Sequence, residues 1–303
     1  MIQDYHARLA YFGAPTQVNR DSAIRHVADT ALWMAHIRAV ENRRSNAAFH
    51  DSLAALLAGD RGRRIARSIP HSTAAAWGMV IRTSAIDRLI VEALSLGVDT
   101  VLNLGAGFDT RPYRMSLPAG LRWIEVDFPD LVESKNAKLA ATAPVCKVER
   151  IGMDLTDRAA RNELFARLGG VAKNGLLVSE GLIPYFSNED VDDLARGLHR
   201  TPSFRHWIQD FDNAGERRKM PKSWEKKLSA APFLFQAKDW FEFFKQAGWQ
   251  TQKVITSAEE SELIHRPYPF VFPMGFLMHA LPKSIREKVL SVSGAVLFKK
   301  DSP

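Results

Sequence analysis

The chain has 303 residues, of which 46% are hydrophobic and 25% are charged, and its net charge is +7. This composition excludes a mainly disordered protein, and the length allows a large buried core without a disulfide or a metal to stabilise it. The single cysteine, Cys146, excludes an internal disulfide and favours a reducing compartment. No stretch approaches the ~20 consecutive apolar residues of a membrane span, and we find no signal-peptide pattern. We therefore expect a cytoplasmic protein that does not enter a membrane.

The basic residues form short clusters, as at residues 61–64 and 217–219. They are not interleaved with aromatic residues, as a single-strand binding surface requires, and no zinc-finger, RNA-recognition or helix-turn-helix pattern is present. We therefore expect an arginine-rich enzyme surface or an acidic small-molecule partner, and we do not expect nucleic-acid binding.

Residues 1–98 are predicted to form an N-terminal helical cap. Apolar residues at helical spacing predict a first helix that starts at residue 21 or 22 and ends at about residue 42. A second helix is predicted over residues 52–58, with its end near Gly59, and a third over residues 83–96.

Residues 99–303 alternate short apolar runs with helical patterns, which is typical of βαβ units with right-handed crossovers. The predicted fold is therefore α/β, with a Rossmann-like, mostly parallel, doubly wound sheet. Segments near residues 212–234 and 257–285 interrupt the pattern and are predicted insertions that form part of the substrate pocket. The last strand is predicted to bend at Gly294 and to pair with the sheet, because its apolar residues need burial. The predicted strands cover residues 100–104, 122–127, 146–151, 176–179, 204–211, 252–255 and 289–298, and the predicted helices cover residues 131–140, 159–168, 191–198 and 237–246.

A glycine-rich turn with Gly105, Ala106 and Gly107 follows the first predicted strand. Glycines at this place let the backbone approach a ligand, and a following helix N-terminus can offer N–H groups. A nicotinamide dinucleotide fingerprint requires a third glycine, and Thr110 occupies that position. The turn therefore favours a nucleotide cofactor without a pyrophosphate, such as S-adenosylmethionine.

Two acids, Glu125 and Asp127, end the second predicted strand, about twenty residues after the glycines, where an acid can accept hydrogen bonds from both ribose hydroxyls. Both side chains point to the same face, because side chains alternate along a strand. We prefer Asp127, since it lies nearer to the carboxyl end of the strand, where ligands bind. The alternative is a surface acid that caps the next helix.

Two further acids follow the third and fourth predicted strands. Asp154 can accept a hydrogen bond from an adenine amino group while Leu155 packs on the ring; alternatively, Asp154 caps the next helix. Glu180 lies beside the point where the strand order reverses and can reach an ammonium group. For Glu180 the alternative is a solvated loop acid.

Four stretches carry a family likeness: residues 82–87 (RTSAID), residues 104–114 (LGAGFDTRPYR), residues 125–129 (EVDFP) with Lys135, and residues 179–186 (SEGLIPYF). Together they resemble the leucine carboxyl methyltransferase family, a group of class I S-adenosylmethionine-dependent methyltransferases. The likeness is strongest to the bacterial branch, which includes O-methyltransferases of polyketide biosynthesis. It extends over more than half of the chain and implies a class I methyltransferase fold.

The resemblance implies cofactor contacts where the motifs match. Arg82 stands where the family uses an arginine for the methionine carboxylate, a role suited to bidentate guanidinium geometry. Gly105 matches the glycine that touches the cofactor. The remaining matches are Asp127 for the ribose, Asp154 and Leu155 for the adenine side, and Glu180 for the acid after the fourth strand.

A basic residue of the N-terminal helix also meets the carboxylate in this family. Arg38 is the candidate, and Arg25 is the alternative. The chain departs from the bacterial branch near residues 49–52, where Ser52 replaces the proline of an acidic-proline motif. This departure affects the expected shape of the local lid and not the cofactor contacts.

Methyl transfer is an in-line displacement, so the protein must align the nucleophile with the methyl group and exclude water. A carboxylate acceptor needs no general base at neutral pH, whereas a phenol or an alcohol does. No base is evident, because His71, His199 and His265 are scattered along the chain. Tyr185 is a candidate for the acceptor site; the alternative is a packed aromatic residue.

Three arginines, Arg111, Arg114 and Arg266, are candidates for attracting an anionic acceptor, with ordinary surface arginines as the alternative. No metal site is predicted, because no histidine pair has ligand spacing with a carboxylate and the cysteine stands alone.

The sequence therefore predicts an O-methyltransferase that acts on a carboxylate or a phenol of a small molecule, in secondary metabolism, or on a peptide C-terminal carboxylate. The alternatives are an NAD(P)-dependent oxidoreductase on a similar sheet and a non-enzymatic binding module. Thr110 disfavours the oxidoreductase, and the joint presence of Arg82, Asp127 and Glu180 disfavours the non-enzymatic module. The sequence predicts neither the acceptor itself nor the oligomeric state.

Overall fold

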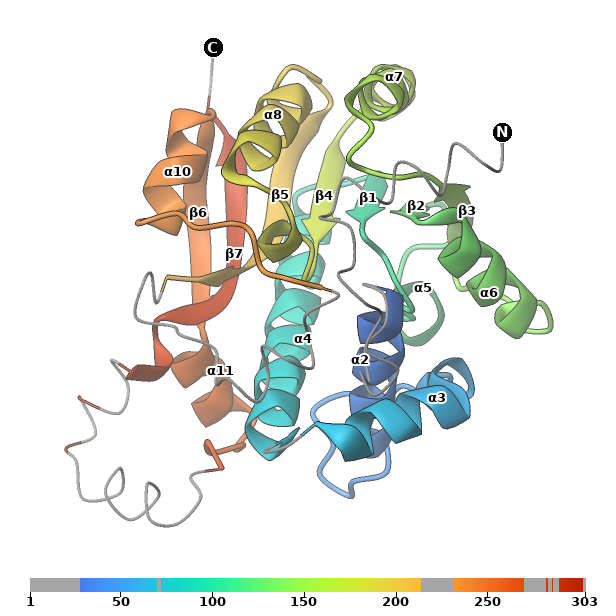
Figure 1. Cartoon of the computed structure of the whole chain (residues 1–303). Helices are drawn as coiled ribbons and strands as arrows, with labels where there is room; N and C mark the ends of the chain where they lie inside the picture. The colour runs from blue at the N-terminus through green and yellow to red at the C-terminus, as the bar shows by residue number, and fades with distance from the viewer. Residues whose placement is uncertain are drawn as a thin grey trace, which may run out of the picture.

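The computed structural model describes residues 28–69, 72–213, 231–269, 282, 285 and 289–301. Its strands are β1 Thr100–Leu104, β2 Arg122–Asp127, β3 Lys147–Gly152, β4 Gly175–Ser179, β5 Phe204–Asp212, β6 Trp249–Thr256 and β7 Ser293–Lys300. Among the described residues they form one seven-stranded sheet in the order β3-β2-β1-β4-β5-β7-β6 (Figure 1). Strands β1 to β5 are parallel, and β7 runs antiparallel between β5 and β6.

The elements that accompany the sheet are α4 Ser72–Ser95, α5 Arg111–Arg114, α6 Pro129–Leu139, α7 Arg158–Gly169, the 3₁₀ helix η2 Ile183–Tyr185, α8 Asn188–His199, α10 Trp240–Gln246 and α11 Ser257–Leu263. Helix α4 packs on one face of the sheet through residues such as Ile86 and Ile90. Helices α7, α8 and α10 pack on the other face, for example through Phe165 and Phe244. Since both faces are covered, β1 and β4 are buried along their whole length, and the predicted doubly wound α/β fold is confirmed.

Helices α2 (Ala28–Glu41) and α3 (Ala54–Ser68) precede α4 and lie next to the carboxyl ends of β1 and β2 (Figure 1, blue). They approach closely because Gly62 has no side chain: a Cβ there would lie 2.6 Å from the Leu32 carbonyl oxygen. Gly59 bends α3 with a φ of 55° and a ψ of −163°, a conformation that favours glycine. The two helices therefore form a layer beside the edge at which the parallel strands end.

The helix boundaries in this N-terminal region differ from the predictions. Helix α3 does not end near Gly59 as predicted, because the chain bends there and resumes the helix to Ser68. Helix α4 begins at Ser72 and not near residue 83, since the alanines at 74–76 favour a helix by propensity without any apolar periodicity. The predicted start of the first helix lies outside the described residues.

The predicted strands β1 and β2 have the observed bounds, and β3, β4 and β5 differ by one residue at their ends. Strand β7 begins at Ser293 and not at residue 289. Gly294 pairs with Phe211 on one side and Thr256 on the other. A Cβ at Gly294 would lie 2.2 Å from the Ile255 carbonyl oxygen, so close strand packing explains this glycine.

The predicted division into a cap of residues 1–98 and a core of residues 99–303 stays a prediction, and α4, from the first part, packs against β5 and β7. Most of the predicted insertion near 212–234 and much of the one near 257–285 lie outside the described residues, but α11 lies within the second. None of the helices among the described residues combines the length and hydrophobicity that crossing a bilayer requires.

Candidate functional site

The glycine turn after β1 has the backbone conformation that its sequence predicts. Gly105 and Gly107 have φ angles of +66° and +47°, which disfavour residues with a Cβ. The Gly105 and Ala106 N–H groups donate to the Val126 carbonyl oxygen of β2 at 2.8 and 3.2 Å. A Cβ on Gly105 would lie 2.8 Å from Leu182 Cδ1. The turn therefore lies directly against the segment that follows β4.

The two acids of β2 have different surroundings. Asp127 accepts hydrogen bonds from the Gly107 N–H at 2.6 Å and the Phe128 N–H at 2.8 Å, and burial raises its pKa although both bonds lower it. Glu125 is 1% exposed and forms ion pairs with Lys135 and Arg150, both at 2.7 Å. The Glu125 carboxylate is therefore held inside the fold, whereas the Asp127 carboxylate lies at the glycine turn.

The pair after β3 forms a turn. Asp154 Oδ1 accepts hydrogen bonds from the Thr156 N–H at 2.9 Å and the Thr156 hydroxyl at 2.7 Å. The cap of α7 is Asp157, whose side chain accepts from two N–H groups of the helix, so the alternative role of Asp154 as that cap is wrong. Leu155 is 6% exposed and belongs to the core between the sheet and α7 and α8.

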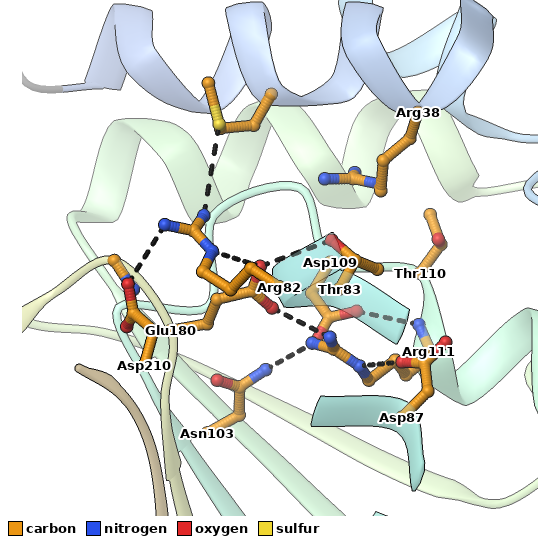
Figure 2. Close-up of polar contacts among 12 residues, drawn as sticks. Arg38, Arg82, Thr83, Asp87, Asn103, Asp109, Thr110, Arg111, Glu180 and Asp210 are labelled. Atoms are coloured by element: carbon orange, nitrogen blue, oxygen red, sulfur yellow. Dashed lines mark hydrogen bonds and ion pairs between the residues drawn. The ribbon is translucent and has the colours of Figure 1, made fainter. Parts of the chain in front are cut away.

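Arg82 links α4 to the ends of two strands (Figure 2). Its Nε donates to Glu180 Oε1 and its Nη1 to Asp210 Oδ2, each at 3.0 Å. Asp210, on β5, also accepts a hydrogen bond from the Gly181 N–H at 2.7 Å. Gly181 has a φ of +65°, and a Cβ there would lie 3.4 Å from two guanidinium nitrogens of Arg82. The glycine after Glu180 thus leaves room for this arginine.

Arg111 is the most enclosed of the three arginines Arg38, Arg82 and Arg111, with 2% of its side chain exposed. Its Nε contacts Asp87 at 2.6 Å, its Nη1 contacts Asp109 at 2.9 Å and its Nη2 contacts Glu180 Oε2 at 2.8 Å (Figure 2). Burial alone would raise the pKa of Glu180, but Arg111 and Arg82 lower it to about 2. Glu180 is therefore a paired, ionised carboxylate and not a solvated loop acid.

The predictions for the three acceptor-attracting arginines are wrong. Arg111 is buried as described, and Arg114 has an 8% exposed side chain that contacts Asp87 at 2.6 Å. Arg266 Nη2 contacts Glu41 at 2.7 Å and the Asn46 carbonyl oxygen at 2.8 Å. Each guanidinium is committed to protein groups, so none is a free surface charge that could attract an acceptor.

Arg38 lies on α2, beside the glycine turn. Its Nε contacts Asp51 Oδ2 at 2.9 Å, and its Nη2 donates to the Phe108 carbonyl oxygen at 2.5 Å. The same Asp51 oxygen accepts a hydrogen bond from the Thr110 hydroxyl at 2.6 Å. Asp51, 1% exposed, thus connects the helical layer to the glycine turn. The alternative candidate, Arg25, lies outside the described residues.

Tyr185 lies between the helical layer and the strand ends. Its ring packs edge-on against Phe233, with ring centroids 5.3 Å apart, and belongs to the cluster of Trp33 and Ile37 from α2. Burial raises its pKa, although a hydrogen bond with Thr30 lowers it. Its predicted place at the acceptor site stays a prediction.

Of the three histidines considered as bases, the structure describes His199 and His265. His199 pairs with Asp301 at 2.7 Å, at the opposite edge of the sheet, and His265 follows α11; His71 lies outside the described residues. The described part of the chain also contains no group of three or more histidine, cysteine or acidic residues that could hold a metal ion.

The sequence interpretation missed Asp210 and the burial of Arg111. Asp210 offers one signal, since it is an acid near the carboxyl end of a predicted strand, where ligands bind. Arg111 offers none beyond its place in a family motif, because arginine is ordinarily exposed. Its burial depends on acids from α4, from the loop that follows the glycine turn and from the end of β4.

Comparison with known proteins relates this arrangement to a family. The sequence profile of the family named leucine carboxyl methyltransferase matches residues 31–199, which is more than half of the chain. The chain belongs to the leucine carboxyl methyltransferase family. A relative from Parafrankia, named as an inferred S-adenosyl-L-methionine-dependent methyltransferase, is 32% identical over 203 residues, which cover 63% of this chain and 65% of that protein. The chain thus spans slightly less than two thirds of this relative.

Solved structures show the same fold at low identity. A DUF574 family protein from Streptomyces avermitilis superposes with a TM-score of 0.56 at 16% identity, over 94% of this chain and 100% of that one. A protein from Thermobifida fusca, described as an inferred methyltransferase, gives a TM-score of 0.55 at 14% identity, over 96% and 99% of the two chains. The predicted class I methyltransferase fold is confirmed for this member of the leucine carboxyl methyltransferase family.

Proposed function

We propose that this family member is an S-adenosylmethionine-dependent O-methyltransferase whose acceptor is a carboxylate. The observation that carries the proposal is the pairing of Arg82 with Glu180 beside the glycine turn. A guanidinium suits a carboxylate and an ionised acid suits an ammonium group, so this pair fits the two charged groups of an amino-acid tail.

The other residues at this edge fit the adenosine part of such a cofactor. Gly105 and Gly107 keep the turn free of side chains, and Asp127 lies at the turn with a carboxylate that can accept from ribose hydroxyls. Asp154 and Leu155 are the candidates for the adenine side, and Arg38 is a further candidate for the carboxylate. When bound, the cofactor supplies a methyl group on a sulfonium centre. The residues of this chain bind and orient the cofactor and the acceptor, and they exclude water.

The charges of the site favour an acceptor that is already ionised. A general base works best when its pKa lies near the working pH, but Glu180 has its pKa lowered to about 2 by its arginines. Burial raises the pKa of Tyr185, so its hydroxyl stays protonated at neutral pH and can donate to a carboxylate. The phenol and the peptide C-terminal carboxylate are the other acceptors within this proposal.

The experiment has two stages. Calorimetry compares the binding of S-adenosylhomocysteine with that of NAD; binding of NAD alone would overturn the proposal and favour the oxidoreductase alternative. Incubation with methyl-labelled cofactor and small acids, phenols and peptides then identifies the acceptor. If base treatment releases the methyl label from the product, the product is an ester. If the label resists base, the product is an ether and the acceptor is a phenol.

The setting of the reaction belongs to the same proposal. We place it in the cytoplasm, since the single cysteine, Cys146, allows no internal disulfide, as is usual for proteins of a reducing compartment. Secondary metabolism is the proposed context, because the motifs resemble the polyketide O-methyltransferases of the bacterial branch.

A further inference from the structure

Arg111 connects three of the segments that carry or adjoin candidate cofactor contacts. Asp87 lies on α4, the helix of Arg82; Asp109 lies in the loop that follows the glycine turn; and Glu180 follows β4. Each carboxylate receives a different nitrogen of the one guanidinium, at distances between 2.6 and 2.9 Å. A planar fork with fixed donor directions holds three partners in a way that a single ammonium cannot.

The Glu180 carboxylate is held at both oxygens by different arginines. Arg82 holds Oε1 and is itself 17% exposed, whereas Arg111 holds Oε2 and is 2% exposed. A group as enclosed as Arg111 is not available to a ligand. Its effect on a ligand must therefore pass through the residues that it holds.

We propose that Arg111 is a positioning residue of the cofactor site, which holds the Glu180 carboxylate in place to receive the cofactor's ammonium group without touching the cofactor. The inference rests on the role given to Glu180 in the proposed function. Glu180 faces Arg82 and Thr83 from α4, Arg111 from α5 and Asp109 from the loop after β1, and it shares Arg82 with Asp210 of β5.

Arg114 provides a matched control. It contacts Asp87 through two nitrogens, at 2.6 and 2.9 Å, and it is nearly as buried as Arg111. None of its described ion pairs is with Glu180 or Asp109. Replacing either arginine by methionine removes a buried charge beside Asp87, but only Arg111→Met releases Glu180.

The test compares two ligands on the full-length protein. S-Adenosylhomocysteine carries the ammonium and carboxylate groups, and 5′-methylthioadenosine has the same adenosine without them. Calorimetry at pH 7.5 measures both affinities for the wild type, Arg111→Met, Arg114→Met and Glu180→Gln, and circular dichroism checks the fold of each. Arg111→Lys, which keeps one charge, replaces Arg111→Met if the latter does not fold.

We expect Arg111→Met to lower the affinity for S-adenosylhomocysteine by roughly tenfold or more, as the loss of a charged hydrogen bond does. Its affinity for 5′-methylthioadenosine should stay within about threefold of the wild type, because that ligand has no ammonium group for Glu180 to bind. Arg114→Met should keep the wild-type preference for S-adenosylhomocysteine. Loss of Arg111 also raises the pKa of Glu180, so S-adenosylhomocysteine binding to Arg111→Met should weaken between pH 7 and pH 5 more than wild-type binding does.

Two results would overturn the inference. If Arg111→Met lowers the affinity for both ligands equally, the role of Arg111 is to maintain the fold of the turn. If Glu180→Gln keeps the wild-type preference, Glu180 does not bind the ammonium group and Arg111 has nothing to position. Failure of the wild type to bind S-adenosylhomocysteine is a separate outcome that refutes the proposed function itself.

Discussion

Asp51 offers the sharpest test of how the helical layer is attached to the glycine turn. In Asp51→Asn the side chain keeps its size but loses the charge that pairs with Arg38 and accepts from Thr110. Removing one partner of a buried ion pair costs ~3–5 kcal/mol. Arg38 is 12% exposed and keeps its bond to the Phe108 carbonyl oxygen, so we expect a lower cost of about 2–3 kcal/mol in the free energy of unfolding.

For a chain of 303 residues the unfolding entropy is about 0.6 kcal/mol/K, so this cost corresponds to a fall of about 3–5 °C in Tm. Differential scanning fluorimetry measures that fall. The control is Asp60→Asn, which removes the acid of another aspartate–arginine pair, the one with Arg63. Both side chains of that pair are exposed, at 71% for Asp60 and 59% for Arg63, so we expect this variant to change Tm by about 1 °C or less. Equal shifts for the two variants would refute the idea that Asp51 secures the helical layer.

Three further predictions concern single side chains. Asp127→Ala should weaken the binding of S-adenosylhomocysteine by about 1–3 kcal/mol through loss of the ribose acceptor; unchanged affinity in calorimetry would remove Asp127 from the site. Arginines lower the pKa of Glu180 from 4.5 to about 2, so its stabilising contribution is complete above pH 4.5 and disappears as the pH falls towards 2. Urea unfolding should thus show that the difference in the free energy of unfolding between the wild type and Glu180→Gln shrinks as the pH falls from 4.5 to 2. A difference that stays constant over this range would contradict the prediction. Burial raises the pKa of the Cys146 thiol to about 11, so a thiol reagent at pH 7.5 should label it only in denaturant, and rapid labelling of the native protein would show that the thiol is accessible.

Local patterns predicted the parallel strands β1 to β5 to within one residue, but missed the first three residues of β6 and began β7 four residues early. The runs that form β1 and β2 are short and bounded by turn residues, so their limits follow from neighbouring residues alone. The glycine turn was predictable for the same reason, since a positive φ is a local property of Gly105 and Gly107. The choice between Glu125 and Asp127 used the direction of the chain along a strand, and the structure adds the ion pairs that hold Glu125 in the fold.

Long-range partnerships were not predictable in this way. Arg82 and Asp210 are 128 positions apart, and β2, α6, β3, α7 and β4 lie between Arg111 and Glu180 along the chain. No local pattern shows that several acids and arginines will meet, because their encounter depends on the crossovers that bring strand ends together. The bend at Gly59 was missed for a related reason: a glycine ends many helices, and only the packing of α3 on α2 shows that the helix resumes.

The placement of β7 affects how the protein can be made. In the described sheet, β6 is hydrogen-bonded only to β7, and β7 comes last along the chain. During synthesis the nascent polypeptide must therefore hold β6, with its apolar Trp249 and Ile255, off the sheet until residues 293–300 leave the ribosome. Assembly from the N-terminus can therefore place β1 to β5 first, whereas β6 gains its strand partner only after β7 has been made.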